Sequence, residues 1–522
     1  MERIDNINSG VELCFLDKRD GGLRLCAKLY SSAPVSYVEY VINGEGKTAD
    51  IISCTQISDT FCHIFTIFLD ATLLADNVAL TFKESVRTSH FFPIDLKCNG
   101  YHQIDNILVY NEGEVIMLSP ATKALLKERR KKYKVLFFNK ASLVAYAMRV
   151  VSWLLKPFFK KDVWLISDRL HKAGDNGEVF FDYVTKNTPS NVKPIFVLDK
   201  KSSDYKRMKA KGKVISPRSI LYKLYYLMAK MNISSQLDGS RLLKVRPYLK
   251  DIMNKQKIIF LQHGVIKDDL STYYNRFDFG MDMFVTTTKG EYDSIVGIKN
   301  YWCDKEITSL VGLCRYDRLE NEKEKIIFIC PTWRLSLLED TENETPIKDF
   351  ENSQYFRFYN HLLHNTELIS KAKECGYRIC FYPHQMMEKT NAFFKNLDPV
   401  VILGGGYSYN DVFRKGDLLL TDYSSIQFDF AYLKKPVIYA QFDKDEFTSS
   451  HTYVPGYFDY EKHGFGPVST SLDDTVALLC NYMDNGCAIE EKYEQRINNT
   501  FMFTDKGNCE RTLKRILEIR NA

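Results

Sequence analysis

Residues 417–436 read DLLLTDYSSIQFDFAYLKKP, and this stretch carries the strongest signal for the fold. An apolar run ends at Thr421, and Asp422-Tyr423-Ser424-Ser425 then leads into a helical pattern. A short apolar run followed by a helix predicts a strand that is buried on both faces of a parallel sheet. Asp and Ser favour helix N-caps, and the same position can also bind a phosphate. The stretch therefore predicts a polar loop at the carboxyl end of a buried strand.

Similar strand-and-helix units occur on both sides of this stretch. Their apolar runs are VWLIS (163–167), VKPIFVL (192–198), MNISS (231–235), KIIFLQ (257–262), KIIFIC (325–330), YRICFY (377–382), VVILGG (400–405) and KPVIYA (435–440). Alternating strands and helices are typical of doubly wound α/β units, which bind ligands beyond the carboxyl ends of their strands. We therefore predict two such units in tandem, at 162–310 and 311–522, with a cleft between them.

The N-terminal third of the chain differs from the rest. Residues 1–118 contain short alternating runs such as LRLCAKLY and HIFTIFLD, separated by turn residues. This pattern predicts a small all-β accessory domain that resembles a β-sandwich. No catalytic constellation stands out within it.

Residues 119–161 form a basic, apolar connection. They include the run KERRKKYK (127–134) and the apolar run ASLVAYAMRVVSWLLKPFF (141–159), which Arg149, Lys156 and Pro157 interrupt. A membrane-spanning helix needs ~20 predominantly apolar residues, so we expect none here. Two interpretations stay open, namely a helix that lies in a membrane interface and a linker helix that packs on the next domain.

Composition and length limit the class of protein. The 522 residues suggest roughly three domains on the usual size of a domain, and the 45% hydrophobic and 26% charged residues are typical of a globular chain. The 13 Cys include no CxxC pair, which indicates free thiols in a reducing compartment. The polar start MERIDNINSG does not look like a secretory signal, so we expect a cytoplasmic protein.

Two histidines follow predicted strands in different units. His263 comes after KIIFLQ and precedes Gly264, and His384 follows Tyr382-Pro383. An imidazole with a pKa near ~6.5 suits general base catalysis at neutral pH. One imidazole could take a proton from an attacking hydroxyl while the other donates hydrogen bonds to phosphoryl oxygens. The alternative is that each is a hydrogen-bonded structural histidine.

Charged residues also follow predicted strands. Arg334 in PTWR and Arg315 in GLCRYD could clamp a pyrophosphate, or could form ordinary salt bridges. Lys267 adds positive charge after His263, and Asp175-Asn176 lie in a turn that opens a helix of the first unit.

The order of these motifs carries more information than any one of them. SDRLHKAGDN, LQHG, GLCRYD, PTWR, PHQ, TDYSS and HGFGP follow one another between residues 167 and 467. This series resembles the CDP-glycerol glycerophosphotransferase family of teichoic acid and capsule synthesis, over about residues 162–500. Gln385 follows His384 where the family usually has Pro.

The resemblance implies a pair of Rossmann-like domains of the GT-B type, with the acceptor on 162–310 and the CDP-donor on 311–522. It implies transfer of glycerol phosphate, or of a related polyol phosphate such as ribitol phosphate, from a CDP-polyol to a hydroxyl of a polymer or lipid-linked primer, with release of CMP. The site residues that we expect are His263 and His384 as catalytic groups, Arg315, Thr332, Arg334, Thr421, Asp422, Ser424 and Ser425 at the donor, and Asp175, Asn176 and Lys267 on the acceptor side.

The resemblance also implies a place at the cytoplasmic face of the membrane, as a peripheral protein that binds no nucleic acid. We expect no tightly bound cofactor and no metal held by the protein, and a loosely bound Mg²⁺ on the donor stays open. Two other functions stay open as well. One is a GT-B glycosyltransferase that uses a nucleotide-sugar, and the other is a non-catalytic, membrane-associated binding protein.

Overall fold

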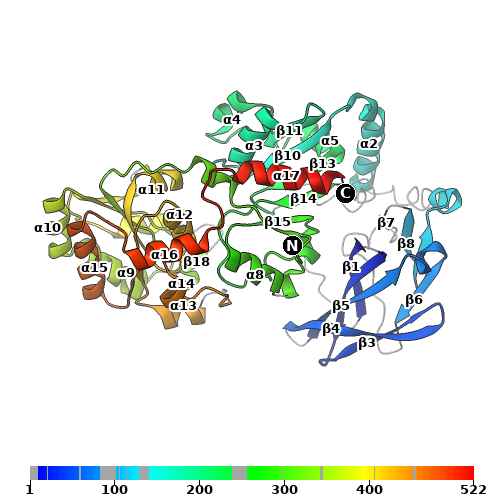
Figure 1. The fold of residues 1–522 in the computed structure, drawn as a ribbon, viewed down its shortest axis with the longest axis horizontal. Coiled ribbons are helices and arrows are strands. Elements are labelled where there is room, and N and C mark those ends of the chain that lie inside the picture. Colours follow the sequence, from blue (N-terminus) through cyan, green and yellow to red (C-terminus); the bar gives the residue numbers. More distant parts are fainter. Residues whose placement is uncertain are drawn as a thin grey trace.

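The computed structural model describes residues 10–19, 21–57, 60–82, 102–104, 106–112, 115–128, 140–237, 256–297, 299–340, 345–404, 406–450 and 454–521. Three large sheets organise these residues into a mixed α/β fold (Figure 1). The antiparallel sheet lies at one end of the molecule, one parallel sheet lies in the middle and the other lies at the opposite end. Most of the predicted basic run 127–134 lies outside the described residues.

The N-terminal sheet has nine strands, and all its neighbours run antiparallel. In spatial order they are β1 (Gly10–Arg19), β2 (Gly22–Ser31), β5 (Thr60–Asp70), β4 (Glu45–Ile57), β3 (Tyr37–Ile42), β6 (Val78–Phe82), β9 (Val115–Pro120), β8 (Ile107–Glu112) and β7 (His102–Ile104). The first half of β4 pairs with β3, and its second half pairs with β5 after a register shift between Ile51 and Ser53. The strands of the predicted sandwich thus form one continuous sheet whose alternate side chains share one core.

The first parallel sheet has seven strands. In spatial order they are β12 (Val214–Ile215), β11 (Val192–Val197), β10 (Asp162–Ser167), β13 (Ala229–Ser234), β14 (Lys257–Phe260), β15 (Met283–Thr286) and β16 (Thr308–Leu310). Its helices are α3 (Asn176–Asn187), α4 (Tyr205–Lys211), α5 (Ile220–Met228), α7 (Arg276–Phe279) and α8 (Lys289–Gly297). The strand order reverses direction between β10 and β13, which is where doubly wound sheets open for ligands.

The second parallel sheet has six strands and the same kind of reversal, between β17 and β22. In spatial order the strands are β21 (Val401–Leu403), β20 (Arg378–Phe381), β17 (Ile326–Ile329), β22 (Gly416–Thr421), β23 (Val437–Ala440) and β24 (Val468–Ser469). Its longer helices are α9 (Gln354–Leu363), α10 (Thr366–Cys375), α11 (Tyr409–Lys415), α12 (Ile426–Tyr432), α13 (Lys444–Ser450), α14 (Tyr460–His463), α15 (Leu472–Asp484) and α16 (Glu491–Thr500). A short hairpin of β18 (Leu338–Asp340) and β19 (Thr345–Pro346) follows β17.

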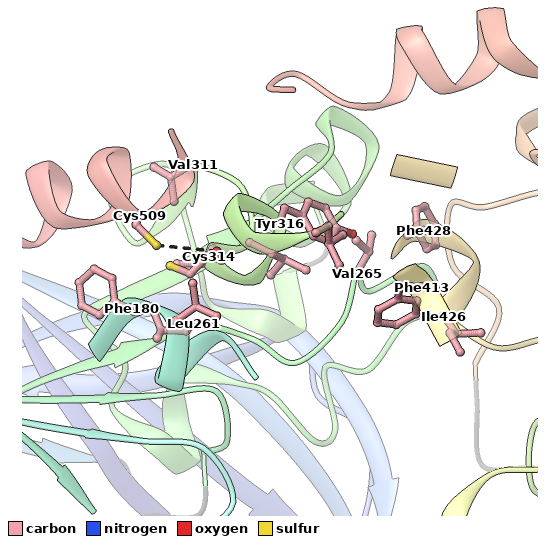
Figure 2. Close-up of a cluster of buried hydrophobic side chains, with 14 of the residues drawn as sticks. Phe180, Leu261, Val265, Val311, Cys314, Tyr316, Phe413, Ile426, Phe428 and Cys509 are labelled. Carbon is pink, nitrogen blue, oxygen red and sulfur yellow. Dashed lines mark hydrogen bonds between the residues drawn. The ribbon is translucent and has the colours of Figure 1, made fainter. Parts of the chain in front are cut away.

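The two parallel units share one hydrophobic core at their junction. Figure 2 shows Phe180 and Leu261 from the first unit in the same cluster as Phe413 and Phe428 from the second. The connecting turn η6 (Cys314–Arg318) adds Tyr316, which stacks on Tyr432 with ring centroids 4.1 Å apart. The junction is therefore packed like a protein interior, and it holds the two sheets in a fixed relation.

The last helix, α17 (Asn508–Asn521), returns to the first parallel unit (Figure 1). Arg520 Nε donates to Asp162 at the start of β10 at 2.9 Å, and Arg515 Nη2 donates to the backbone oxygen of Glu306 at 2.9 Å. The region predicted as one domain, 311–522, thus ends with a helix that packs on the other unit.

The predicted linker contains α2 (Lys140–Leu155) and the turn η2 (Lys156–Phe158). Met148 of α2 and Phe159 pack on α5, where the rings of Phe159 and Tyr225 lie 5.4 Å apart. Trp153, Leu154 and Phe158 are exposed. Among the described residues, no helix is both long and apolar enough to cross a membrane.

Candidate functional site

Hydrogen bonds to buried groups hold the loop that carries His263 in place. Gln262 adopts a left-handed backbone conformation with φ 61°, and its Nε2 donates to Val285 O at 2.6 Å and to Glu291 Oε1 at 3.0 Å. The backbone N–H of Ile266 also donates to Glu291 Oε1, at 2.7 Å. Burial raises the pKa of Glu291 to about 7. A single buried carboxyl group therefore fixes both ends of the loop, and with them the position of the imidazole.

His263 itself sits among charged groups. Burial lowers its pKa, the Asp175 carboxylate opposes this shift, and the Arg169 and Arg315 guanidinium groups add to it. Its Nδ1 is buried and has no hydrogen-bond partner within the described part of the chain. The imidazole is therefore neutral at physiological pH, which is the form that can accept a proton.

Arg315 links the two parallel units. Its Nε and Nη2 donate to the two carboxylate oxygens of Asp429 at 2.6 and 2.8 Å. Its Nη1 donates to Asp175 Oδ1 at 2.8 Å and to the backbone oxygen of His263 at 2.7 Å. All three guanidinium nitrogens thus donate to protein acceptors, and the arrangement fixes the His263 loop to α12 of the other unit.

The predicted acceptor residues lie next to this link. Asp175 is the N-cap of α3, and Asn176 is fully buried, with Nδ2 donating to the backbone oxygen of Gln262 at 2.7 Å. Lys267 is also buried, and its Nζ lies 2.5 Å from Asp268 Oδ2 and over the ring of Tyr460. Asn176 and Lys267 therefore have structural partners, and Asp175 is shared between a helix cap and Arg315.

A second buried network underlies the loop after β22. Thr332 donates from its hydroxyl to Asp422 Oδ1 at 2.6 Å, and Arg334 Nη2 donates to Asp422 Oδ2 at 2.8 Å. Arg334 Nε also donates to Asp443 Oδ2 at 2.8 Å. Thr421 donates its hydroxyl to the backbone oxygen of Cys330 at 2.7 Å. This network joins the loops after β17, β22 and β23, and it consists of the buried residues predicted at the donor, Thr332, Arg334, Thr421 and Asp422, together with the buried Asp443.

Ser424 and Ser425 follow Asp422 of this network and directly precede α12. We call residues 422–425 the serine loop. A Cβ placed on Gly264 would lie 3.0 Å from Ser425 Oγ. The His263 loop of the first unit and the serine loop of the second are therefore in direct contact. Together with the hydrogen bonds of Arg315 to Asp175 and to the backbone oxygen of His263, this contact joins the predicted site residues of the two units.

His384 follows β20 in the second unit. Its Nδ1 accepts a hydrogen bond from the backbone N–H of Met386 at 3.3 Å, so the proton of the neutral ring is on Nε2. Burial lowers the pKa of His384 to about 4, Arg169 adds to this shift and Asp422 opposes it. A neutral imidazole with its proton on Nε2 can donate a hydrogen bond to an anionic oxygen.

Several residues of this region were not predicted from the sequence. Glu291, Asp429 and Asp443 anchor the loops, and Arg169 acts on the pKa of both imidazoles. Arg169 lies within SDRLHKAGDN directly after a strand, so its position could have identified it. Within the described ranges, no group of three or more His, Cys, Asp or Glu side chains could hold a metal ion.

Comparison with known proteins identifies the family of this chain. The family model for CDP-Glycerol:Poly(glycerophosphate) glycerophosphotransferase matches residues 147–518. The minor teichoic acid biosynthesis protein GgaB of Bacillus subtilis is 37% identical over 407 residues, which are 76% of this chain and 44% of GgaB. The teichoic acid poly(glycerol phosphate) polymerase of Bacillus subtilis is 39% identical over 75 residues, which are 14% of this chain and 10% of that relative.

The chain thus spans less than half the length of these relatives. Among solved structures, the wall teichoic acid polymerase TagF matches with a TM-score of 0.51 at 18% identity, over 76% of this chain and 96% of that chain. At this identity, the likeness concerns the fold.

Proposed function

The chain belongs to the CDP-glycerol:poly(glycerophosphate) glycerophosphotransferase family, and we propose that it transfers a polyol phosphate from a CDP-polyol to a hydroxyl group of a cell-surface polymer or its lipid-linked primer. Glycerol phosphate is the first candidate for the transferred group, since the family's description names it. The observation that carries this proposal is the contact between Gly264 and Ser425, which brings the loop that carries the neutral His263 of one unit against the serine-bearing loop of the other.

The two parallel units form a GT-B-type pair in this proposal. The strand order in both sheets reverses beside the first strand of the unit, at β10/β13 and at β17/β22. The loops that carry His263, Ser424 and His384 all follow the carboxyl ends of strands. The first unit would bind the acceptor, and the second would bind the CDP moiety and the pyrophosphate.

The proposed reaction is a single displacement at the β-phosphorus. His263 takes the proton as the acceptor oxygen forms its bond to phosphorus, the bond from phosphorus to the bridging oxygen breaks, and CMP leaves. The Ser424 and Ser425 hydroxyl groups and the Nε2–H of His384 donate to the phosphate oxygens, whose negative charge must be stabilised. Arg315 and Arg334 hold the loops that carry these groups in place, through their hydrogen bonds to His263 and Asp422.

A donor panel tests this function. The chain is incubated with CDP-glycerol, CDP-ribitol and UDP-sugars in the presence of a polyol-phosphate primer, and the released nucleotide and the length of the product are measured. We expect CMP release with at least one CDP-polyol and an increase in product mass of whole polyol-phosphate units. Release of UDP alone would show a glycosyltransferase, and no release with any donor would leave a binding protein.

The surface formed by α2 and η2 supports a peripheral position on a membrane. Leu143, Trp153, Leu154 and Phe158 are exposed, and Lys156 is exposed beside them. Apolar side chains with neighbouring lysines suit an interface of anionic lipids.

Vesicle flotation tests this position. We expect the chain to float with vesicles that contain phosphatidylglycerol, and a Trp153→Glu/Leu154→Glu variant to lose most of this binding. A matched variant, Tyr37→Glu, changes an exposed aromatic residue of the antiparallel sheet and should bind like wild type. Equal flotation of all three proteins would remove the α2 surface from this role.

A further inference from the structure

Arg169 lies in the turn after β10, beside the point where the strand order of the first sheet reverses. The turn is held by its neighbour Asp168, which is buried and accepts hydrogen bonds from the backbone N–H groups of Asp175, Gly177 and Glu178. The side chain of Arg169 is exposed. The backbone is thus fixed, while the guanidinium group remains accessible to a ligand.

The guanidinium group of Arg169 reaches across to the second unit. Its Nη1 donates to Gln385 Oε1 at 3.4 Å, and Gln385 directly follows His384. Its charge also acts on the imidazoles of His263 and His384, one in each unit. Arg169 of the first unit therefore lies beside the loop of the second unit that carries His384.

The charges of the surrounding groups show why a cation is needed here. Arg315 is paired with two carboxylates, Asp175 and Asp429, and Arg334 is paired with Asp422 and Asp443. Each cluster thus contains one more carboxylate than guanidinium. A phosphate that approaches these clusters is repelled unless a further positive charge compensates them.

Arg169 can supply this charge. Among the residues that the structure describes, no carboxylate forms an ion pair with it, in contrast to Arg315 and Arg334. A guanidinium group offers a planar fork of donors that matches two oxygens of one phosphate. The long contact to Gln385 is a weak one that a ligand can replace.

We propose that Arg169, with Gln385 opposite, is a catalytic residue that binds the non-bridging oxygens of the phosphoryl group being transferred. This inference rests on the proposed function, since it assigns a role within that reaction. A phosphate that binds here is either the β-phosphate of the CDP-polyol or a phosphodiester of the acceptor polymer, and we assign it to the donor because Arg169 Nη1 contacts Gln385, which follows His384 in the unit proposed to bind the CDP moiety.

Binding measurements with and without the β-phosphate test this assignment. Calorimetric titrations compare wild type, Arg169→Gln and Arg169→Lys with CDP-glycerol, CMP and inorganic pyrophosphate. We expect Arg169→Gln to weaken the binding of CDP-glycerol and pyrophosphate by about 10- to 100-fold and to leave the binding of CMP unchanged, because a charge-assisted hydrogen-bond pair is lost. Arg169→Lys should restore only part of the affinity, because an ammonium group cannot bind two oxygens in the same way.

The matched control is Lys172→Gln, which removes an exposed charge from the same turn and should bind all three compounds like wild type. A higher KM for the acceptor with unchanged binding of CDP-glycerol would assign Arg169 to the acceptor phosphate and overturn the donor assignment. Unchanged binding of both CDP-glycerol and pyrophosphate would overturn the proposal. Since pyrophosphate carries no nucleoside and no polyol, its result also holds if the donor panel rejects CDP-polyols, so the two failures are distinguishable.

Discussion

The two parallel units both present their predicted site residues after the ends of strands, but they support these loops by different chemistry. In the first unit, the His263 loop rests on Glu291, a buried acid that accepts hydrogen bonds from amide groups and whose pKa is raised to about 7 by burial. In the second, the serine loop rests on Arg334, which is paired with Asp422 and Asp443. The comparison teaches that a site of this kind can be held by a buried acid or by a buried ion pair. The two supports should fail under different conditions.

Loss of His263 should have the largest effect of any single change. His263→Ala removes the proposed general base, and we expect kcat to fall by about 10²- to 10⁴-fold while CDP-glycerol binding and the unfolding transition stay close to wild type. Release of CMP by the purified variants measures this. His361→Ala, an exposed histidine on α9, is the matched control and should retain full activity. An unchanged rate in His263→Ala would remove the imidazole from the reaction.

Arg334→Met should be the most destabilising change in the second unit. The variant leaves Asp422 and Asp443 buried without their cation, and breaking a buried pair by removal of one partner costs about 3–5 kcal/mol. The free energy of unfolding in urea measures this. Arg378→Met is the control, since Arg378 is exposed and lies 3.8 Å from Glu324, and it should cost less than about 1 kcal/mol. Similar losses in both variants would contradict a structural role of the Arg334 network.

The strands and the residues at their ends could be predicted from the sequence, but the buried groups that support the loops could not. The apolar runs KIIFLQ, KIIFIC and DLLLT correctly predicted β14, β17 and β22, because a strand buried on both faces needs a continuous apolar run. The same reasoning placed His263 and Ser425 at strand ends. Pairings such as Arg315 with Asp429 connect residues 114 positions apart, and an arginine after a strand has the same local pattern whether it is paired or free.

The N-terminal region shows a similar limit. Alternation predicted strands there, because it reports which side chains face a core. It does not report which strands are neighbours. The long strand β4, which pairs with β3 in its first half and with β5 in its second, joins what would otherwise be two sheets.

Gly264→Ala tests the contact between the two units, with a smaller expected effect. The new methyl group would lie 3.0 Å from Ser425 Oγ, so the serine must shift by a few tenths of an ångström. We expect a loss of activity of about 10-fold, because small displacements of positioned groups are costly in catalysis. Steady-state rates of CMP release measure this. Gly297→Ala, where no atom lies within 4 Å of the new methyl group, should retain the wild-type rate. Equal rates in both variants would show that the position of Ser425 does not affect the reaction.

The pH dependence of stability should show the smallest effects, and their signs should be opposite in the two units. Glu291 has a raised pKa of about 7, so the fold retains a proton that the unfolded chain loses above pH ~4.5, and its contribution to stability falls as the pH rises from 4.5 to 7. His384 has a lowered pKa of about 4, so the unfolded chain binds a proton that the fold excludes, and its contribution falls as the pH drops from 6.5 to 4.

Urea unfolding of wild type, Glu291→Gln and His384→Gln across this range measures both slopes. Relative to wild type, Glu291→Gln should gain stability as the pH rises, and His384→Gln should gain stability as the pH falls. His361→Gln is the control for an exposed imidazole and should follow wild type. Parallel curves for all four proteins would mean that neither group titrates differently in the fold. That result would contradict both the raised pKa of Glu291, which supports the His263 loop, and the lowered pKa that keeps His384 neutral.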